Sequence, residues 1–410
     1  MLLSYSRREL GGLSALRILL AIYLMMFHTL PSYRGLPGWL QELVSSGYMA
    51  TSMFFLLSGF ILSHVYLSGD GLRITPAEFL KTRFLTLYPI HLIGLALSSA
   101  ILLVQWRATG TFHVVADIPP AMQSLAEQNV MVEVGPLAML GSFISHVLLL
   151  HAWNPFFLSF NIPSWSISAL LCFYFAFVGL GPRLVRCGHP VWLLLGLNVL
   201  YLLPPLWFVL QGDYSASATG FLHTNPLARL PEFLSGVVLY RIMRRVELVY
   251  LTRGQFWVCL FCAVLALFML DDWLASLGPA GYYFSHNGGL MLLQCAVLVL
   301  FAGVREFRTP WLYEGMKRLG NASLSMFILH LPLFFLLTRF EKLVRFLVAG
   351  DWSSPWWPQI KAIEPSVAMY PLIVLVVLAA SVWCQESLVI RLRDFLKRRT
   401  HSVSSRLKTA

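Results

Sequence analysis

Apolar residues recur along this chain in runs long enough to form membrane-spanning helices. A helix needs about 20 mostly apolar residues to cross the ~30 Å hydrocarbon core of a bilayer. Polar stretches separate the apolar segments, which cover residues 13–31, 48–67, 84–105, 137–150, 165–181, 190–210, 230–243, 256–271, 287–304, 321–338 and 367–385. The pattern predicts an all-α, polytopic integral membrane protein.

The first apolar run differs from a removable signal peptide. It follows Arg7 and Arg8, as a signal peptide would, but it is long and contains His28. It also lacks the small-x-small site at which signal peptides are cleaved. We therefore interpret residues 13–31 as the first spanning helix.

Basic residues indicate which segments cross the membrane, because cytoplasmic loops are enriched in Lys and Arg. With the N-terminus inside, and with the short segment 137–150 entering without crossing, most of the 30 basic residues lie inside. If that segment crossed, the clusters around Arg183, Arg241 and Arg305 would move outside. The sequence thus predicts about ten transmembrane helices plus one re-entrant or short helix. It further predicts a transmembrane domain at 1–390, a basic tail at 391–410, and both termini in the cytoplasm.

Composition agrees with this class. Hydrophobic residues make up 58% of the chain and charged residues 12%, about half the usual ~25% of soluble proteins. The net charge of +11 reflects short loops and the tail, so it indicates topology and no nucleic-acid partner. Cys259 and Cys262 have metal-ligand spacing but no second pair nearby, so we expect reduced thiols and no metal.

Arg17 and His28 are ionisable residues inside the first span, where such groups are costly and often functional. Eleven residues at 100° each come within about 20° of a whole number of turns, so both side chains share one face, about 16 Å apart along the axis. Leu20, Ala21 and Leu24 lie between them on that face. A snorkelling arginine and a packing histidine are the structural alternatives. The unperturbed pKa of histidine suits general acid–base catalysis.

Other polar residues in the spans are more ambiguous. His330 and His91 are interpreted first as interior histidines with hydrogen-bond partners. Ser58 and Gly59 permit close approach of helices. Trp165, with Ser166 beside it, fits an interfacial tryptophan at a helix start.

Six motifs follow one another along the spans. They are Arg17 with His28 eleven residues later; Met53–Phe60, like FFxxSGF; Phe79–Pro89, like RxxRxxP; Trp165–Tyr174, like WSLSxExxFY; Arg229–Gly236, like RxxEFxxG; and Ser323–Pro332, like SYSxYLxHxP. Together they resemble the membrane-bound acyltransferase 3 family, which acylates cell-surface carbohydrates. Because the chain ends about 25 residues after the last span, we expect a version without an extracytoplasmic hydrolase-like domain.

The resemblance implies transfer of an acyl group, most commonly acetyl, from cytoplasmic acyl-CoA to a hydroxyl of a cell-surface or lipid-linked carbohydrate. It implies that Arg83 and Lys81 bind the CoA phosphates, with Arg17 and His28 as catalytic residues and His28 as base or acyl relay. It also implies a bacterial inner membrane. The candidate pore or acceptor residues are Ser58, Trp165, Ser166, Tyr174, Arg229, Glu232 and His330.

The sequence departs from the family pattern at two positions. Thr86 replaces the second basic residue of the RxxR stretch, and Leu170 replaces the acidic residue of the WSLSxE motif. The alternative hypothesis is a transporter or flippase without acyl-transfer chemistry, because buried His and Arg also mark ion pathways. A purely structural membrane subunit would leave Arg17, His28 and Arg83 unexplained.

Overall fold

The computed structural model describes residues 11–68, 71–116, 130–245, 251–304 and 310–392, and these are mostly helical. The helices are α1 (Gly11–Thr29), α2 (Gly38–Ser45), α3 (Met49–Tyr66), α4 (Pro76–Thr109), α5 (Pro136–Val147), α6 (Trp165–Arg186), α7 (Pro190–Gln211), α8 (Ala216–Thr224), α9 (Pro226–Arg245), α10 (Arg253–Ser276), α11 (Pro279–His286), α12 (Met291–Ala302), α13 (Pro310–Ala349), α14 (Trp356–Ala362) and α15 (Tyr370–Cys384). A π-helical turn, Gln385–Ile390, continues α15. The all-α prediction is confirmed.

Short elements connect the helices. Two antiparallel hairpins pair β1 (Leu67–Ser68) with β2 (Gly71–Leu72) and β3 (Phe112–Ala116) with β4 (Val130–Val134). Neither hairpin was predicted. Single 3₁₀ turns occur at Leu30–Ser32, Ser46–Tyr48, His151–Trp153, Ile162–Ser164 and Val367–Met369.

Nine helical stretches within the described residues are long and apolar enough to cross a membrane. The remaining predicted span, 230–243, lies in α9, whose 20 residues are long enough, at 1.5 Å per residue, to cross. It is less apolar than the others because Arg229 and Glu232 lie near its start and further arginines near its end. Helix α5 has only 12 residues, about 18 Å of helix, which is too short to span and agrees with a re-entrant or short helix.

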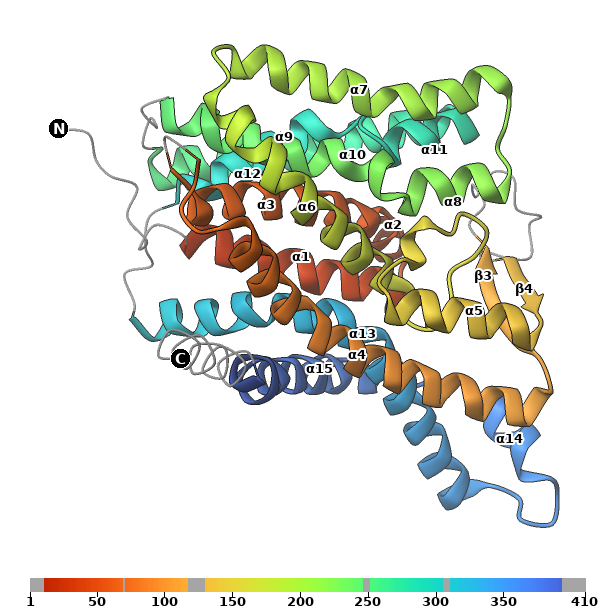
Figure 1. Cartoon of the computed structure of the whole chain (residues 1–410). Coiled ribbons are helices and arrows are strands. Elements are labelled where there is room, and N and C mark those ends of the chain that lie inside the picture. The colour runs from red at the N-terminus through yellow and green to blue at the C-terminus, as the bar shows by residue number, and fades with distance from the viewer. Residues whose placement is uncertain (1–10, 69–70, 117–129, 246–250, 305–309, 393–410) are drawn as a thin grey trace, which may run out of the picture.

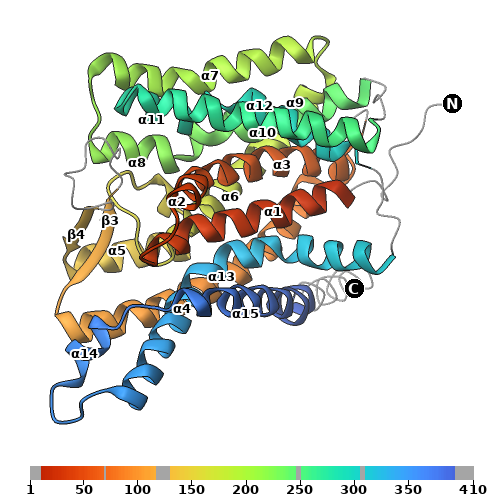
Figure 2. The same ribbon diagram turned by 180° about the vertical axis from the view of Figure 1, so that it is seen from behind.

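Helices α1 and α3 lie in the middle of the bundle (Figures 1 and 2). Helix α9 packs on α3 and also contacts α6 and α7, whereas α13 packs on α1 and contacts α4 and α15. The central helices are therefore covered on both sides by protein. This burial is what allows them to carry ionisable side chains at membrane depth.

The contact between α3 and α9 depends on two glycines that face each other. A Cβ at Gly59 would collide with the backbone oxygen of Phe233, and a Cβ at Gly236 would collide with the backbone oxygen of Leu56. Small residues permit such close approach of membrane helices. The expectation for Gly59 is confirmed, and the glycine of the Arg229–Gly236 motif is its counterpart.

The bundle has two chemically different ends. The arginine end is the end at which α1, α4 and α13 begin and α3, α6 and α9 end (Figure 1). The described basic residues near it include Arg17, Arg73, Lys81, Arg83, Arg183, Arg186, Arg241, Arg244, Arg253, Lys317, Arg318 and Arg391. The histidine end is the opposite one, where α1 finishes just after His28.

Substituting Gly59 by Val should separate α3 from α9 and destabilise the bundle. We expect a loss of about 1–3 kcal/mol, the usual cost of overpacking, measured as a lower midpoint of thermal unfolding in nanodiscs. Gly196→Val is the matched control, because no atom lies within 4 Å of a Cβ built there. Equal losses in the two variants would contradict the packing role of Gly59.

Candidate active site

His28 pairs with His330 at the histidine end of α1. His28 Nδ1 lies 3.0 Å from His330 Nε2, and the rings are 5.1 Å apart and inclined by only 20°. His330 is 1% exposed, and its Nδ1 lies 3.2 Å from the backbone oxygen of Met326. The structure therefore brings together one histidine that we expected to be catalytic and one that we interpreted mainly as structural.

The hydrogen bonds of this pair determine its tautomers. A neutral imidazole has one donor and one acceptor nitrogen. The Met326 carbonyl only accepts, so His330 donates through Nδ1 and accepts through Nε2. His28 must then donate through Nδ1, which leaves the lone pair on His28 Nε2. His28 is therefore oriented by His330, and His330 is oriented by the Met326 carbonyl. This arrangement is typical of catalytic histidines.

His223 of α8 is a further residue at the histidine end, and sequence reasoning missed it. It is close enough to His28 to interact with it electrostatically. Its ring meets the ring of Trp165 edge-on, with centroids 4.9 Å apart. Trp165 is buried, so it lines the interior and does not lie at the lipid interface. His223 lies between two apolar segments, and only its histidine side chain could have marked it.

Arg229 and Glu232 form a buried ion pair near the same end. Arg229 Nη2 lies 3.2 Å from Glu232 Oε1, and both side chains are almost completely buried. Tyr201 donates a hydrogen bond to Glu232. Arg229 also donates to Ser52 Oγ at 2.9 Å and to the His286 carbonyl at 2.7 Å.

The side chain of Arg229 lies between aromatic rings. Its guanidinium is within 6 Å of the rings of Phe55, Trp165 and Tyr201. Arginine is favoured in such places because it combines aromatic stacking with directed hydrogen bonds. Trp165 touches both Arg229 and His223, so the ion pair supports the wall beside the histidine pair.

Arg17 and Arg83 meet at the arginine end. They lie close enough to interact electrostatically, and Tyr174 interacts with both. Arg83 donates to Tyr66 Oη at 2.6 Å, and its guanidinium lies 5.0 Å from the Tyr66 ring centroid. No ion pair found within the described residues includes either arginine. Two neighbouring cations without a carboxylate form an arrangement suited to binding an anion.

The other candidates are placed less centrally. Lys81 is exposed and precedes Arg83 by two residues, so it projects from the opposite side of α4. Ser166 Oγ donates to the Pro163 carbonyl at 2.9 Å, an ordinary local bond at a helix start. Ser58 is half-buried beside Gly59. Thr86 donates to the Thr82 carbonyl of its own helix, and Leu170 is buried in the hydrophobic core.

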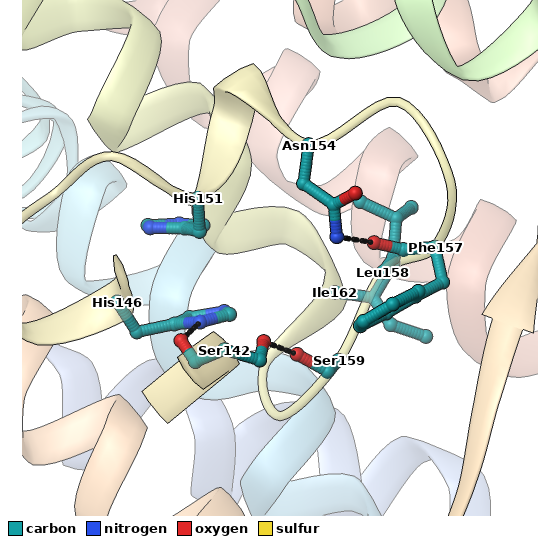
Figure 3. Close-up of a pocket in the computed structure, with 8 residues that line it drawn as sticks. All are labelled: Ser142, His146, His151, Asn154, Phe157, Leu158, Ser159 and Ile162. Atoms are coloured by element: carbon teal, nitrogen blue, oxygen red, sulfur yellow. Dashed lines mark hydrogen bonds between the residues drawn. The ribbon is translucent and has the colours of Figure 1, made fainter. Parts of the chain in front are cut away.

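Three histidines stack beside α5. The rings of His146 and His151 are 3.9 Å apart, and His91 lies 5.4 Å from His151, all nearly parallel. His91 Nε2 lies 2.9 Å from the His146 carbonyl, whereas His91 Nδ1 is buried without a hydrogen-bond partner within the described residues, so the expected satisfied histidine is only half satisfied. Burial lowers the pKa of His146 to about 4 and that of His151 well below its ordinary value. They line a pocket of about 10 Å³ with Ser142, Asn154 and Ser159 (Figure 3), room for about one water.

Replacing Glu232 by Gln should destabilise the protein strongly. The amide keeps the shape and still accepts from Tyr201, but it leaves the charge of Arg229 buried without a countercharge. Breaking a buried pair in this way costs about 3–5 kcal/mol, readable as a lower midpoint of thermal unfolding. Glu386→Gln is the control, since it breaks the exposed pair with Arg318 and should change little. Similar effects of the two changes would contradict the assigned role of the buried pair.

The chain is similar in sequence to a known protein family and to two curated proteins. The profile of the acyltransferase domain family, Acyl_transf_3, matches residues 10–386. "Protein 2 in picA locus" of Rhizobium radiobacter is 34% identical over 132 residues, 30% of this chain and 60% of that protein. "Acyltransferase MdmB" of Streptomyces mycarofaciens is 28% identical over 220 residues, 50% of this chain and 49% of that protein. The matches thus span less than two thirds of either relative, and no solved structure matches.

Proposed function

Because the chain belongs to the acyltransferase domain family, we propose that it transfers an acyl group from acyl-CoA to a hydroxyl of a carbohydrate. The observation that carries this proposal is the His28–His330 pair, with His28 Nδ1 3.0 Å from His330 Nε2. It supports a base whose free nitrogen is Nε2 of His28. Hydroxyl groups of sugars need such a base, because they are almost entirely protonated at neutral pH.

In the proposed step, one proton moves from the acceptor hydroxyl to His28 and then to the CoA sulfur. His28 Nε2 removes the proton of the acceptor hydroxyl as its oxygen attacks the thioester carbonyl. The carbon–sulfur bond then breaks, and the CoA sulfur leaves with the proton held by His28. His330 accepts the hydrogen bond from His28 Nδ1 throughout and stabilises the cationic imidazolium. If His28 carried the acyl group itself, an acyl-enzyme could be trapped before acceptor is added.

The donor phosphates are proposed to bind at the arginine end, through Arg17 and Arg83. Tyr66 and Tyr174 hold the Arg83 guanidinium, whose Nε is buried without a partner within the described residues. Arginine forks match phosphate geometry. By the positive-inside rule, the excess of basic residues supports a cytoplasmic location for this end, where acyl-CoA is available. We propose on the same ground that both termini lie inside, in a bacterial inner membrane.

The path between the two ends is closed in this structure. Leu20, Ala21 and Leu24, which separate Arg17 from His28 on α1, are each at most 6% exposed. We propose that the pantetheine arm of CoA inserts along this face when α1 and its neighbours separate. Apolar side chains that close around the arm would exclude water and limit hydrolysis of the thioester.

The acceptor is proposed to approach from the histidine end. His223 and Trp165 lie there beside the histidine pair, and aromatic rings with nearby polar groups suit the recognition of a sugar. Acetyl is the donor group expected first. The acceptor class rests on the family resemblance, with a lipid-linked or polymeric carbohydrate as the first choice to test.

Substituting His28 by Gln should reduce acyl transfer by about 10²–10⁴-fold, the usual contribution of a general base. Substituting His330 by Gln should reduce the rate less, because Nε2 of His28 can still accept the proton of the acceptor hydroxyl. The measurement is acceptor-dependent release of CoA thiol from acetyl-CoA, with a panel of sugars, by the protein in nanodiscs. His113→Gln, in the β3–β4 hairpin, is the control and should be unaffected. Full transfer by the His28→Gln protein would exclude His28 as base or acyl carrier.

Substituting Arg83 by Ala should weaken acetyl-CoA binding about tenfold or more, because a charge-assisted phosphate contact is lost. Binding is measured by equilibrium titration in nanodiscs. Lys81→Ala is the matched control: it also removes a basic side chain from α4, but from the opposite face, and should weaken binding less. Equal weakening would contradict a phosphate site built on the Arg83 face of α4.

A further inference from the structure

The histidine pair lies next to a break in the hydrogen bonds of α13. Pro332 is inside this helix and has no backbone N–H, so the carbonyl of Ile328, four residues earlier, lacks its helical donor. Figures 1 and 2 show α13 changing direction midway along its length. In a membrane the freed carbonyl needs a partner from within the protein, since no water is available in the hydrocarbon core.

The side chain of Asn161 supplies that partner. Asn161 Nδ2 donates to the Ile328 carbonyl at 2.8 Å, and Asn161 is 2% exposed. Gly94 of α4 leaves room for this bond: a Cβ there would lie 2.9 Å from Asn161 Nδ2 and 2.5 Å from Ile328 Cγ2. The opposite amide orientation would direct Oδ1 at a carbonyl oxygen, so the donor assignment is the favourable one.

The chain before Asn161 is held in an unusual conformation. Phe160 has a positive φ of 53°, which is uncommon for a bulky residue and costs on the order of 1–3 kcal/mol. Its ring packs edge-on against His146, with centroids 5.1 Å apart. Ser159 Oγ lies 2.6 Å from Ser142 Oγ of α5 (Figure 3). Such strain persists only where surrounding contacts impose it, and here those contacts come from α5.

Helix α5 is in turn fixed to α4. Tyr88 Oη donates to the Val147 carbonyl at 3.0 Å, and His91 Nε2 lies 2.9 Å from the His146 carbonyl. The short helix and the stacked histidines thus form a rigid support for the segment that carries Asn161. Neither has a role in the chemistry proposed above.

We infer that Asn161 is a positioning residue for the catalytic pair: its amide replaces the N–H that Pro332 lacks and thereby holds the turn of α13 that carries His330. This rests on the proposed function of His28 and His330. Ile328 is two residues from His330, and Met326, whose carbonyl fixes His330 Nδ1, is two residues earlier. A shift of this turn would move His330 Nε2 away from His28, and misplacement by about 1 Å can cost 10²-fold in rate.

A double-mutant cycle tests the inference, because Pro332→Ala restores a backbone N–H that can reach the Ile328 carbonyl. In the wild-type background, Asn161→Ala should lower kcat for acetyl transfer by at least about tenfold, with acetyl-CoA affinity unchanged. In the Pro332→Ala background the same change should cost less than about twofold. Asn154→Ala is the matched control, since within the described residues the side-chain hydrogen bonds of Asn154 stay inside its own loop, with Phe156 and Phe157.

A second measurement does not depend on an acceptor. In protein labelled with ¹⁵N-histidine, the ring signals of His28 and His330 should change in Asn161→Ala and return in the double variant with Pro332→Ala. Equal effects of Asn161→Ala in both backgrounds, or unchanged ring signals, would overturn the inference. If wild type and His28→Gln transfer acetyl equally well, the proposed function fails instead, whatever the histidine signals show.

Discussion

The constraint on which this structure depends is that a polar group inside a lipid-embedded bundle must find its partner within the protein. Water is absent from the hydrocarbon core, and an unsatisfied backbone or side-chain group there costs several kcal/mol. The bond from Asn161 to the Ile328 carbonyl and the buried pair of Arg229 with Glu232 both follow from it. So does the chain from the Met326 carbonyl through His330 to His28. In that chain, satisfying each group in turn determines which nitrogen is left to accept a proton.

The arginine end differs because no ion pair within the described residues balances the charge of Arg17 or Arg83. Arg83 is held by tyrosines, which supply hydrogen bonds but no negative charge at neutral pH. Two cations that repel each other are stable together mainly when an anion joins them, and a diphosphate or phosphate would do so. The histidine end thus holds the pair of His28 and His330, and the arginine end holds two arginines without a countercharge. The proposed transfer requires this difference, because the donor phosphates bind at one end and the proton is removed at the other.

Sequence reasoning was most successful where a single helix determined the geometry. The shared face of Arg17 and His28 follows from helical periodicity alone, and the number and kind of apolar segments gave the fold class. Contacts between distant segments were harder. His330 joins His28 across 302 positions of sequence, and Asn161 reaches α13 from a loop of no regular pattern. His223 and His151 lie outside the predicted apolar segments, and His146 lies in the short segment 137–150, whose pattern gives no sign of a partner elsewhere in the chain. The sequence offered one clue to Asn161. Pro332 lies in a membrane helix, so the carbonyl four residues before it must take its hydrogen bond from a donor outside that helix.

Motif residues divide into packing and chemistry only when their contacts are known. The glycines of the second-helix motif and of the Arg229–Gly236 motif face each other across α3 and α9, so they serve the same close contact. The two departures from the family pattern are also consistent with their surroundings. Thr86 satisfies its hydroxyl on its own helix, and Leu170 replaces an acid with an apolar side chain in the hydrophobic core. Neither leaves a buried charge without a partner, and neither touches the bond between His28 and His330 on which the proposed chemistry depends.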